Sequence, residues 1–318
     1  MRAVFLDYAT VSVGDLDPSR LQAAMPGLEL LDAAPQAQVA GRIAGCAIVM
    51  LNKLRITREI IAASPELRLV ALAATGTNNV DVEAAREHGV AVCNIRDYCT
   101  PSVAQHVLGV ILHLTHGLGD YSRIAVDGRW GRSAHFTVLD HPIRLLAGRT
   151  LGIVGWGVLG RAVARACESA LGMTTLVANR PGGGREAGRV DLDELLARAD
   201  VVSLHCPLTP ATQGMIGARE LALMKSDAIL VNTARGALVD VDALASALRQ
   251  RRIGGAAIDV LESEPPVAGS PLFAADLPNL IVTPHTAWAA RESRQRCLDE
   301  IAANVEDFLR GGRRGRVD

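Results

Sequence analysis

The sequence predicts an α/β protein with two doubly wound parallel sheets, and three observations lead to this prediction. Short apolar runs alternate with helical patterns along most of the 318 residues, which is the rhythm of strand–helix–strand units. Hydrophobic residues make up 49% of the chain but aromatic residues only 3%, so the cores must consist of Ala, Val, Leu and Ile, as suits parallel strands covered on both faces. A glycine-rich turn at residues 155–160 joins a strand to a helix near the middle of the chain.

Charge and composition exclude several classes of partner. The formal net charge is −1, so no basic field exists to attract nucleic acid or an anionic membrane. No apolar run approaches the roughly 18 residues that a membrane span needs, and the N-terminal strand is too short for a signal-peptide core. The six cysteines form neither a C-x-x-C pair nor a zinc spacing, which favours free thiols. We therefore expect a cytoplasmic protein that binds no metal, membrane or nucleic acid.

The first 98 residues are predicted to form an α/β domain. Strands are expected at residues 3–6, 47–51, 69–73 and 91–93, with helices at 57–63 and 82–88 between them. A polar loop at residues 74–79 follows the third of these strands. Ligands of open α/β sheets bind beyond the carboxyl ends of strands, so this loop is a candidate substrate loop, with an ordinary turn as the alternative.

A long helix is predicted from Thr100, because Thr is a favourable N-cap and Pro101 suits the first turn. Its residues His113 and His116 share one face, but no acidic or sulfur partner lies nearby in sequence, so a packed linker or dimer helix is preferred to a metal site. Residues 121–149 read as irregular and could form a dimerisation arm.

The strand–helix alternation then resumes over six further strands, which match a doubly wound fold. These strands are expected at residues 150–154, 174–178, 201–204, 228–232, 255–259 and 280–282. A final amphipathic helix, residues 289–310, is expected to return to the N-terminal domain, and the polar, Arg-rich tail after it is expected to fray. The predicted divisions are therefore 1–98, 99–287 and 288–318.

The turn at residues 155–160 has the pattern G-x-G-x-x-G that opens a dinucleotide site. Gly155 lets the chain turn sharply off the strand, Gly157 lets a pyrophosphate approach the backbone, and Gly160 lets the helix pack close to the strand. Free N–H groups and the dipole at the helix start favour the anion. Glycine turns without a ligand also occur, so the surrounding strand and helix carry the prediction.

Three candidate catalytic residues follow three successive strands. Arg235, Glu264 and His285 each come after the end of a strand, so they can converge at one edge of the sheet. Taken singly, Arg235 could form a surface ion pair, Glu264 could be a solvated loop acid, and His285 could neighbour a helix cap. Their joint placement in a dinucleotide-binding fold favours catalysis.

These segments resemble the D-isomer-specific 2-hydroxyacid dehydrogenases. The matching pieces are T-G-T-N-N-V-D (75–81), Y-C-T-P-S-V-A-Q-H (98–106), G-W-G-V-L-G (155–160), H-C-P-L-T-P-A-T (205–212), N-T-A-R-G (232–236), D-V (259–260), E-P-P (264–266) and T-P-H (283–285). The resemblance spans nearly the whole chain. Within the family, the sequence looks most similar to the glycerate dehydrogenase (hydroxypyruvate reductase) branch. The resemblance implies a dinucleotide-binding Rossmann-like domain (99–287) inserted into a flavodoxin-like substrate domain (1–98 with the C-terminal helix), and a homodimer.

The resemblance also implies roles. His285 matches the general acid/base, Glu264 its carboxylate partner, and Arg235 the residue that binds the 2-keto acid. Backbone N–H groups of Thr75 and Gly76 match those that bind the substrate carboxylate, and those of Val158 and Leu159 match pyrophosphate ligands. The remaining positions that match the cofactor lining are Cys206, Thr233, Ala234, Asp259 and Ala287.

Two positions depart from the family pattern. Gln105 stands where Glu usually precedes the His of the linker-helix motif, a position not expected to be catalytic. Asn179, followed by Arg180, stands where an acid usually binds the adenosine ribose and repels a 2′-phosphate. Asn does not repel a phosphate and Arg180 could pair with one, so the sequence indicates NAD or NADP as cofactor and favours acceptance of NADP.

The predicted reaction is reversible, NAD(P)H-dependent reduction of a small 2-keto acid, hydroxypyruvate or glyoxylate, to the D-2-hydroxy acid. A family member acting on lactate, phosphoglycerate or phosphite is the nearest alternative. A non-catalytic, NAD-sensing protein resembling a corepressor is the alternative from another class, against which the set Arg235, Glu264 and His285 argues.

Overall fold

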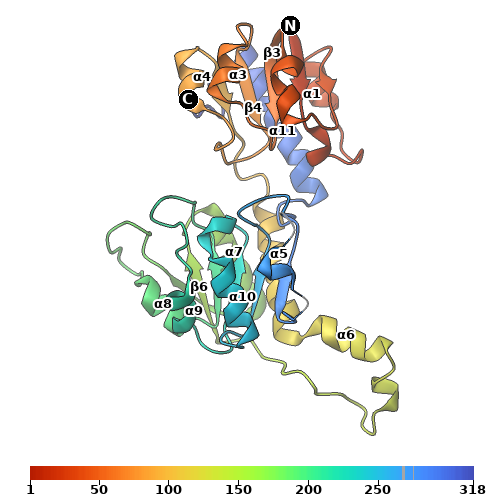
Figure 1. The fold of residues 1–318 in the computed structure, drawn as a ribbon, viewed down its shortest axis with the longest axis vertical. Coiled ribbons are helices and arrows are strands. Elements are labelled where there is room, and N and C mark those ends of the chain that lie inside the picture. The colour runs from red at the N-terminus through yellow and green to blue at the C-terminus, as the bar shows by residue number, and fades with distance from the viewer. Residues whose placement is uncertain (267–268, 275) are drawn as a thin grey trace. The chain divides into compact units, whose positions relative to one another are not determined.

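The computed structural model describes residues 1–266, 269–274 and 276–318, which divide into two units (Figure 1). The first unit combines Met1–Cys99 with Trp288–Asp318, and the second is Thr100–Ala287. The two ends of the chain therefore belong to one unit, and the other unit is inserted between them.

The first unit contains a five-stranded parallel sheet with the strand order β2-β1-β3-β4-β5. Its strands are β1 (Arg2–Phe5), β2 (Glu29–Leu30), β3 (Cys46–Leu51), β4 (Leu69–Leu72) and β5 (Ala91–Cys93). Its helices are α1 (Ser19–Ala24), α2 (Val39–Ile43), α3 (Arg58–Ala62), α4 (Val82–Glu87) and α11 (Arg291–Leu309). This order, with its reversal at β1, is that of flavodoxin-like doubly wound sheets.

Successive residues of each strand point to opposite sides of this sheet, and an apolar layer covers each side. Phe5 and Met50 pack on the same side as Ile301 of α11, whereas Val4 and Val49 pack in a separate core on the other side. The sheet is thus sandwiched between two apolar layers, which explains why its strands read as continuous apolar runs rather than as alternating ones.

The C-terminal tail is ordered, so the expectation that it frays is wrong. The Val317 N–H donates to the Val92 carbonyl (3.0 Å), and the Asn94 N–H donates to the Gly315 carbonyl (2.9 Å). The Val92 N–H also donates to the Asp318 carboxylate (2.9 Å). These bonds continue the sheet beyond β5, so the tail covers a strand edge that would otherwise be open.

The second unit contains a six-stranded parallel sheet with the order β11-β10-β9-β8-β6-β7. Its strands are β6 (Thr150–Val154), β7 (Thr174–Val177), β8 (Val201–Leu204), β9 (Ile229–Asn232), β10 (Gly255–Ile258) and β11 (Leu280–Val282). From β6 the chain first goes outward to β7 and then returns to place β8 on the other side of β6. The strand order therefore reverses at β6, and ligands of doubly wound sheets bind at such a switch point.

The helices of the second unit are α5 (Thr100–His116), α6 (Leu118–Val126), α7 (Val158–Leu171), α8 (Leu192–Arg198), α9 (Ala218–Leu223) and α10 (Val241–Arg249). Helices α5 and α7 pack together, and α5 also packs on β9 and β10. The prediction of irregular structure at residues 121–149 is wrong for its first part, because α6 extends to Val126. In Figure 1, α6 and the segment that follows it extend away from the sheet of this unit.

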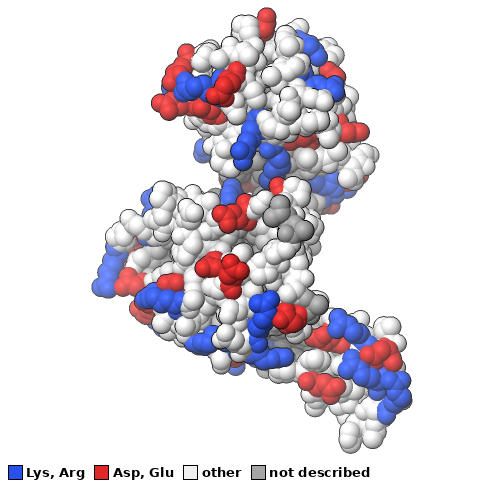
Figure 2. Space-filling model, viewed as in Figure 1, with Lys and Arg blue, Asp and Glu red and all other residues white. Residues whose placement is uncertain are grey.

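Charged side chains of both signs are interspersed on the visible faces of the two units (Figure 2). No large patch of one sign stands out in this view. Among the helices of the described residues, none is both long and apolar enough to cross a bilayer.

Candidate active site

The glycine-rich turn lies at the switch point and could not carry side chains at two of its positions. Gly155 has a φ of +105°, and a Cβ on it would lie 2.5 Å from the backbone N of Cys206. A Cβ on Gly160 would lie 2.1 Å from the Gly155 carbonyl oxygen. Only glycine allows the close approach of β6, the segment after β8 and α7, as the sequence predicts for these two positions.

Gly157 has a different environment that fits a cofactor phosphate. A Cβ on Gly157 would meet no atom within 4 Å, so open space lies next to the backbone where the 14-residue helix α7 begins at Val158. The first backbone N–H groups of α7 point out of the helix end, which favours an anion there. Val158 and Leu159, the predicted pyrophosphate ligands, form the first turn of α7.

Two buried polar atoms near the carboxyl ends of neighbouring strands are also consistent with a bound dinucleotide. The Thr233 hydroxyl follows β9, and the His205 ring follows β8. Neither Thr233 Oγ1 nor His205 Nδ1 has a hydrogen-bond partner within the described residues. Because buried polar atoms are normally satisfied, a polar ligand at this edge of the sheet would account for them.

Arg235 is presented by a turn that a buried asparagine fixes. The Asn232 side chain accepts a hydrogen bond from the Ala234 N–H (3.0 Å) and donates one to the Arg235 carbonyl (2.9 Å). The turn thereby leaves the Arg235 side chain exposed, with one bond from its guanidinium to the Ala234 carbonyl (2.6 Å). The guanidinium stands beyond the end of β9, where an anionic substrate can reach it.

The next residue connects Arg235 with the loop that carries Glu264. A Cβ on Gly236 would lie 2.0 Å from the carbonyl carbon of Leu261, so the two loops touch backbone to backbone. The Leu261 N–H donates to Glu264 Oε1 (2.8 Å), which fixes one oxygen of the Glu264 carboxylate.

The other oxygen of Glu264 binds His285. His285 Nδ1 lies 2.6 Å from Glu264 Oε2, and both side chains are about one-third exposed. His285 has a φ of +54°, an uncommon conformation for a non-glycine residue, and its N–H donates to the carbonyls of Asp259 (2.8 Å) and Thr283 (2.9 Å). Helix α11 begins at Arg291, so His285 is not a neighbour of its N-cap. The structure therefore brings Glu264 and His285 into direct contact.

Asp259 organises the segment that carries His285. Its buried carboxylate accepts hydrogen bonds from the Thr283 hydroxyl (2.5 Å) and from the N–H groups of Thr286 (2.8 Å) and Ala287 (3.0 Å). The Ser102 hydroxyl of α5 donates to the Ala287 carbonyl (2.7 Å). The family resemblance implies that Asp259 lines the cofactor site. In the structure, its carboxylate holds the segment 283–287 in place. Ser102 is a supporting residue that the sequence analysis did not identify, since its partner is 185 positions away.

Asn179, the position predicted to discriminate between NAD and NADP, lies just after β7 and takes part in a hydrogen-bonded network. The Asn179 amide donates to Asp191 Oδ1 (2.8 Å) and accepts from the Glu186 N–H (3.0 Å). Arg180 is exposed beside it. In the sequence, Asp191 reads as an ordinary helix start, and only the parallel pairing of Val190 with Ala178 places it next to Asn179.

The other predicted site residues occupy less distinctive places. Cys206 is buried, with its Sγ 3.7 Å from Met215 Sδ. In the first unit, the Thr75 hydroxyl donates to the Ile95 carbonyl (2.8 Å), and Gly76 follows it in the loop after β4. No three potential metal ligands gather within the described ranges of the chain.

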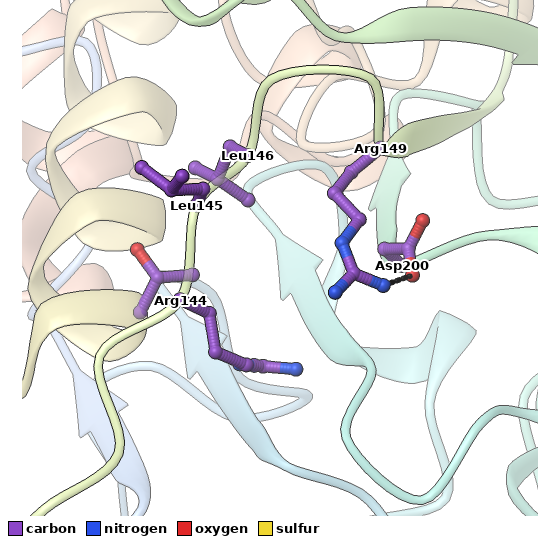
Figure 3. A pocket seen from close by; sticks show the side chains of 6 residues that line it. Arg144, Leu145, Leu146, Arg149 and Asp200 are labelled. Atoms are coloured by element: carbon purple, nitrogen blue, oxygen red, sulfur yellow. Dashed lines mark hydrogen bonds and ion pairs between the residues drawn. The ribbon is translucent and has the colours of Figure 1, made fainter.

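A small pocket elsewhere in the second unit lies at the opposite edge of the sheet (Figure 3). Arg149 donates to Asp200 (3.3 Å) in its wall, and the same carboxylate accepts from the Thr150 N–H (2.8 Å) at the start of β6. Asp200 also precedes β8, so these groups mark the amino ends of the strands. The pocket is therefore separate from the edge that carries the glycine turn.

A doubly wound sheet with a glycine turn at its switch point defines a class of nucleotide-binding proteins. Residues 108–287 match the family described as D-isomer specific 2-hydroxyacid dehydrogenase, NAD binding domain. The chain is 45% identical over 274 residues to a glycerate dehydrogenase of Methylorubrum extorquens, covering 86% of each protein. It is 36% identical to a hydroxypyruvate reductase of Blautia hydrogenotrophica, covering 98% of each. The solved structure of the TT0316 protein from Thermus thermophilus matches with a TM-score of 0.87 at 35% identity, covering 100% of both chains.

The chain belongs to the D-isomer-specific 2-hydroxyacid dehydrogenase family. It is an oxidoreductase that uses a nicotinamide dinucleotide, as the sequence analysis predicts, and the two-sheet α/β architecture is also confirmed.

Proposed function

We propose that this enzyme reduces hydroxypyruvate or glyoxylate reversibly to D-glycerate or glycolate, with NADH or NADPH as the reductant. The names of the similar proteins, a glycerate dehydrogenase and a hydroxypyruvate reductase, support this substrate class. The observation that carries the proposal is the 2.6 Å contact between Glu264 and His285, at the same edge of the sheet as Arg235 and the glycine turn.

In the proposed mechanism the chain's own residues bind the acid and transfer a proton. Glu264 engages Nδ1 of His285, which leaves Nε2 to donate a proton to the substrate oxygen during reduction and to accept it during oxidation. Arg235 binds the carboxylate and polarises the carbonyl, because its planar guanidinium can donate to both. When bound, the nicotinamide supplies the hydride.

The proposal includes acceptance of NADPH. The side chain at the discriminating position is neutral Asn179, and it is followed by exposed Arg180. A 2′-phosphate therefore meets no carboxylate at position 179 and can pair with a guanidinium.

The proposal also includes a homodimer formed through the segment around α6. Large apolar side chains are exposed there, including Val126 (87%), Phe136 (92%), Leu139 (76%) and Leu145 (80%). Burial of such a surface against a second copy would remove it from water. Light scattering of the native enzyme should give twice the mass of the chain, and Phe136→Asp with Leu139→Asp should reduce it to one chain.

A panel of initial rates tests the reaction. Hydroxypyruvate, glyoxylate, pyruvate and 3-phosphohydroxypyruvate are each assayed with NADH and with NADPH. We expect kcat/KM for hydroxypyruvate or glyoxylate to exceed that for the other two acids at least tenfold. A higher value for pyruvate or the phosphorylated acid would assign a different substrate. Absence of turnover with every acid, despite tight dinucleotide binding, would favour the sensing role.

A further inference from the structure

A carboxylate lies beside the cofactor-discriminating position although none is present there in sequence. After β7 the chain loops outward and returns so that Val190 pairs with Ala178, with the Asn179 N–H donating to the Val190 carbonyl (2.7 Å). This backbone pairing places Asp191 next to Asn179. The Asp191 side chain then accepts the Asn179 amide at 2.8 Å.

Asp191 stands at the N-cap of α8, yet its side chain does not cap the helix. Its carboxylate points instead to the loop, where Oδ2 accepts from Arg185 (2.7 Å). Both side chains are largely exposed, at 53% for Asp191 and 85% for Arg185. The Arg185 guanidinium and the Asn179 amide hold the pKa of Asp191 below its usual range, so the carboxylate stays charged at neutral pH.

We propose that Asp191 is a specificity-determining residue for the cofactor. Its carboxylate, 2.8 Å from the Asn179 amide, supplies the negative charge that is missing at position 179, and its ion pair with Arg185 sets how well a 2′-phosphate is accepted. This inference rests on the proposed function, in which the adenosine ribose lies at the end of β7.

The two charges act in opposite directions on the two cofactors. A ribose 2′-hydroxyl can donate to the Asp191 carboxylate, whereas a 2′-phosphate is repelled by it. Arg185 offsets this repulsion, and it can leave Asp191 to bind the phosphate because exposed ion pairs are weak. NADH thus binds with the ion pair intact, and NADPH binds at the cost of rearranging it.

Asp191→Asn is the informative variant, because its amide oxygen still accepts from Asn179 while the negative charge is removed. We expect it to raise the ratio of kcat/KM with NADPH to kcat/KM with NADH roughly tenfold, the effect of removing one like charge near a phosphate. Arg185→Ala should lower the same ratio by a similar factor.

The chain offers a matched control for each variant. Asp193 lies two residues further along and pairs with Arg219 (3.1 Å) instead of Asn179, and Arg189 pairs with Glu186 (2.9 Å) in the same loop. Asp193→Asn and Arg189→Ala should leave the cofactor ratio within twofold of the native value. Raising the salt concentration should shrink the effect of Asp191→Asn, since the interaction is exposed.

A binding measurement separates this inference from the proposed reaction. The dissociation constants of adenosine 2′,5′-bisphosphate and 5′-AMP are measured by calorimetry on each full-length variant. We expect Asp191→Asn to lower the dissociation constant of the bisphosphate roughly tenfold. The dissociation constant of 5′-AMP should stay the same or rise. This result would support the inference even if no 2-keto acid were turned over. An unchanged ratio in Asp191→Asn, or the same change in Asp193→Asn, would overturn it.

Discussion

Glu264 is the single residue whose change tests the proposed proton transfer most directly. Its carboxylate contacts His285 Nδ1 at 2.6 Å, so Glu264→Gln keeps the shape but removes the negative charge beside the imidazole. We expect kcat to fall about 10- to 100-fold while the affinity for the cofactor is retained. Steady-state rates and cofactor titration measure the two quantities. Glu262→Gln, which changes an exposed carboxylate two residues away, should have no such effect.

The buried ring of His205 leads to a prediction about how the free energy of unfolding depends on acidic pH. Burial lowers the pKa of His205 from its ordinary value of 6.5 to about 4. Between these values the unfolded chain binds a proton that the folded chain does not, so the free energy of unfolding decreases as the pH falls from 6.5 towards 4. The decrease is on the order of 3 kcal/mol for this residue.

Urea unfolding of the cofactor-free enzyme at several pH values checks this contribution. His205→Asn removes the titrating group, so its free energy of unfolding should depend less steeply on pH in this window than that of the native enzyme. A constant offset with an identical slope would mean that His205 is not the group responsible.

The residues with proposed catalytic roles could be predicted because each lies in the loop after the carboxyl end of a strand, where doubly wound sheets bind ligands. Asp191 could not be predicted in this way. Its position depends on a single pairing between Val190 and Ala178, and one residue carries no apolar pattern that a sequence could reveal. The support that Asp259 gives to the segment 283–287 could not be predicted either, because it depends on side-chain geometry.

At the scale of secondary-structure elements, the first turn of α5 is hydrogen-bonded to the segment that carries His285. Ser102→Ala removes a buried hydrogen bond of 2.7 Å to the Ala287 carbonyl. We expect about 1 kcal/mol of lost stability and a several-fold lower kcat, because the segment that positions His285 is less constrained. Thr115→Val is the control, since Thr115 binds carbonyls within its own helix at the far end of α5 and should change stability without changing kcat.

A second prediction at the scale of secondary-structure elements concerns the contribution of the C-terminal tail to stability. Removing residues 313–318 deletes the backbone hydrogen bonds that Val317 and Gly315 make beside β5. With the bond that Asp318 accepts from the Val92 N–H, three bonds to backbone groups of residues 92–94 are lost, and we expect the free energy of unfolding of the first unit to decrease by about 3 kcal/mol. Chemical denaturation followed by hydrogen exchange at β5 measures this decrease. Asp318→Ala alone should cause about one-third of it.

Some elements could not be read from their own residues. Helix α6 is only nine residues long, buries one of them, Ile124, and begins directly after Gly117, so the sequence there reads as the end of α5 followed by a loop. The ordered tail is polar, and it is held by backbone hydrogen bonds and by an ion pair between Arg314 and Glu300 of α11. The strands of both sheets, in contrast, are apolar runs of the expected length, and their ends were predictable with an error of at most one residue, apart from the two-residue strand β2.

At the scale of the whole molecule, the cofactor should protect one unit much more than the other. The glycine turn, Thr233 and Asp259 all belong to the second unit. A ligand present at about 100 times its Kd stabilises the folded form that binds it by about 2.7 kcal/mol. Hydrogen exchange with saturating NADH or NADPH, without substrate, should therefore slow at the ends of β6, β8 and β9. Exchange in β3 and β4 should remain unchanged, and equal protection of both units would contradict this assignment.

The return of α11 to the first unit has a consequence for synthesis in the cell. Phe5, Met50 and Ala71 emerge early, but Ile301 and Val305, which cover the same face of their sheet, follow only after the whole of Thr100–Ala287. At about 5–20 residues per second, translation of that insertion takes on the order of 10 to 40 seconds. During this interval the nascent first unit displays a bare apolar face, and the second unit is complete before that face is covered. Chaperone dependence in this enzyme should therefore arise from the domain that is begun first and finished last.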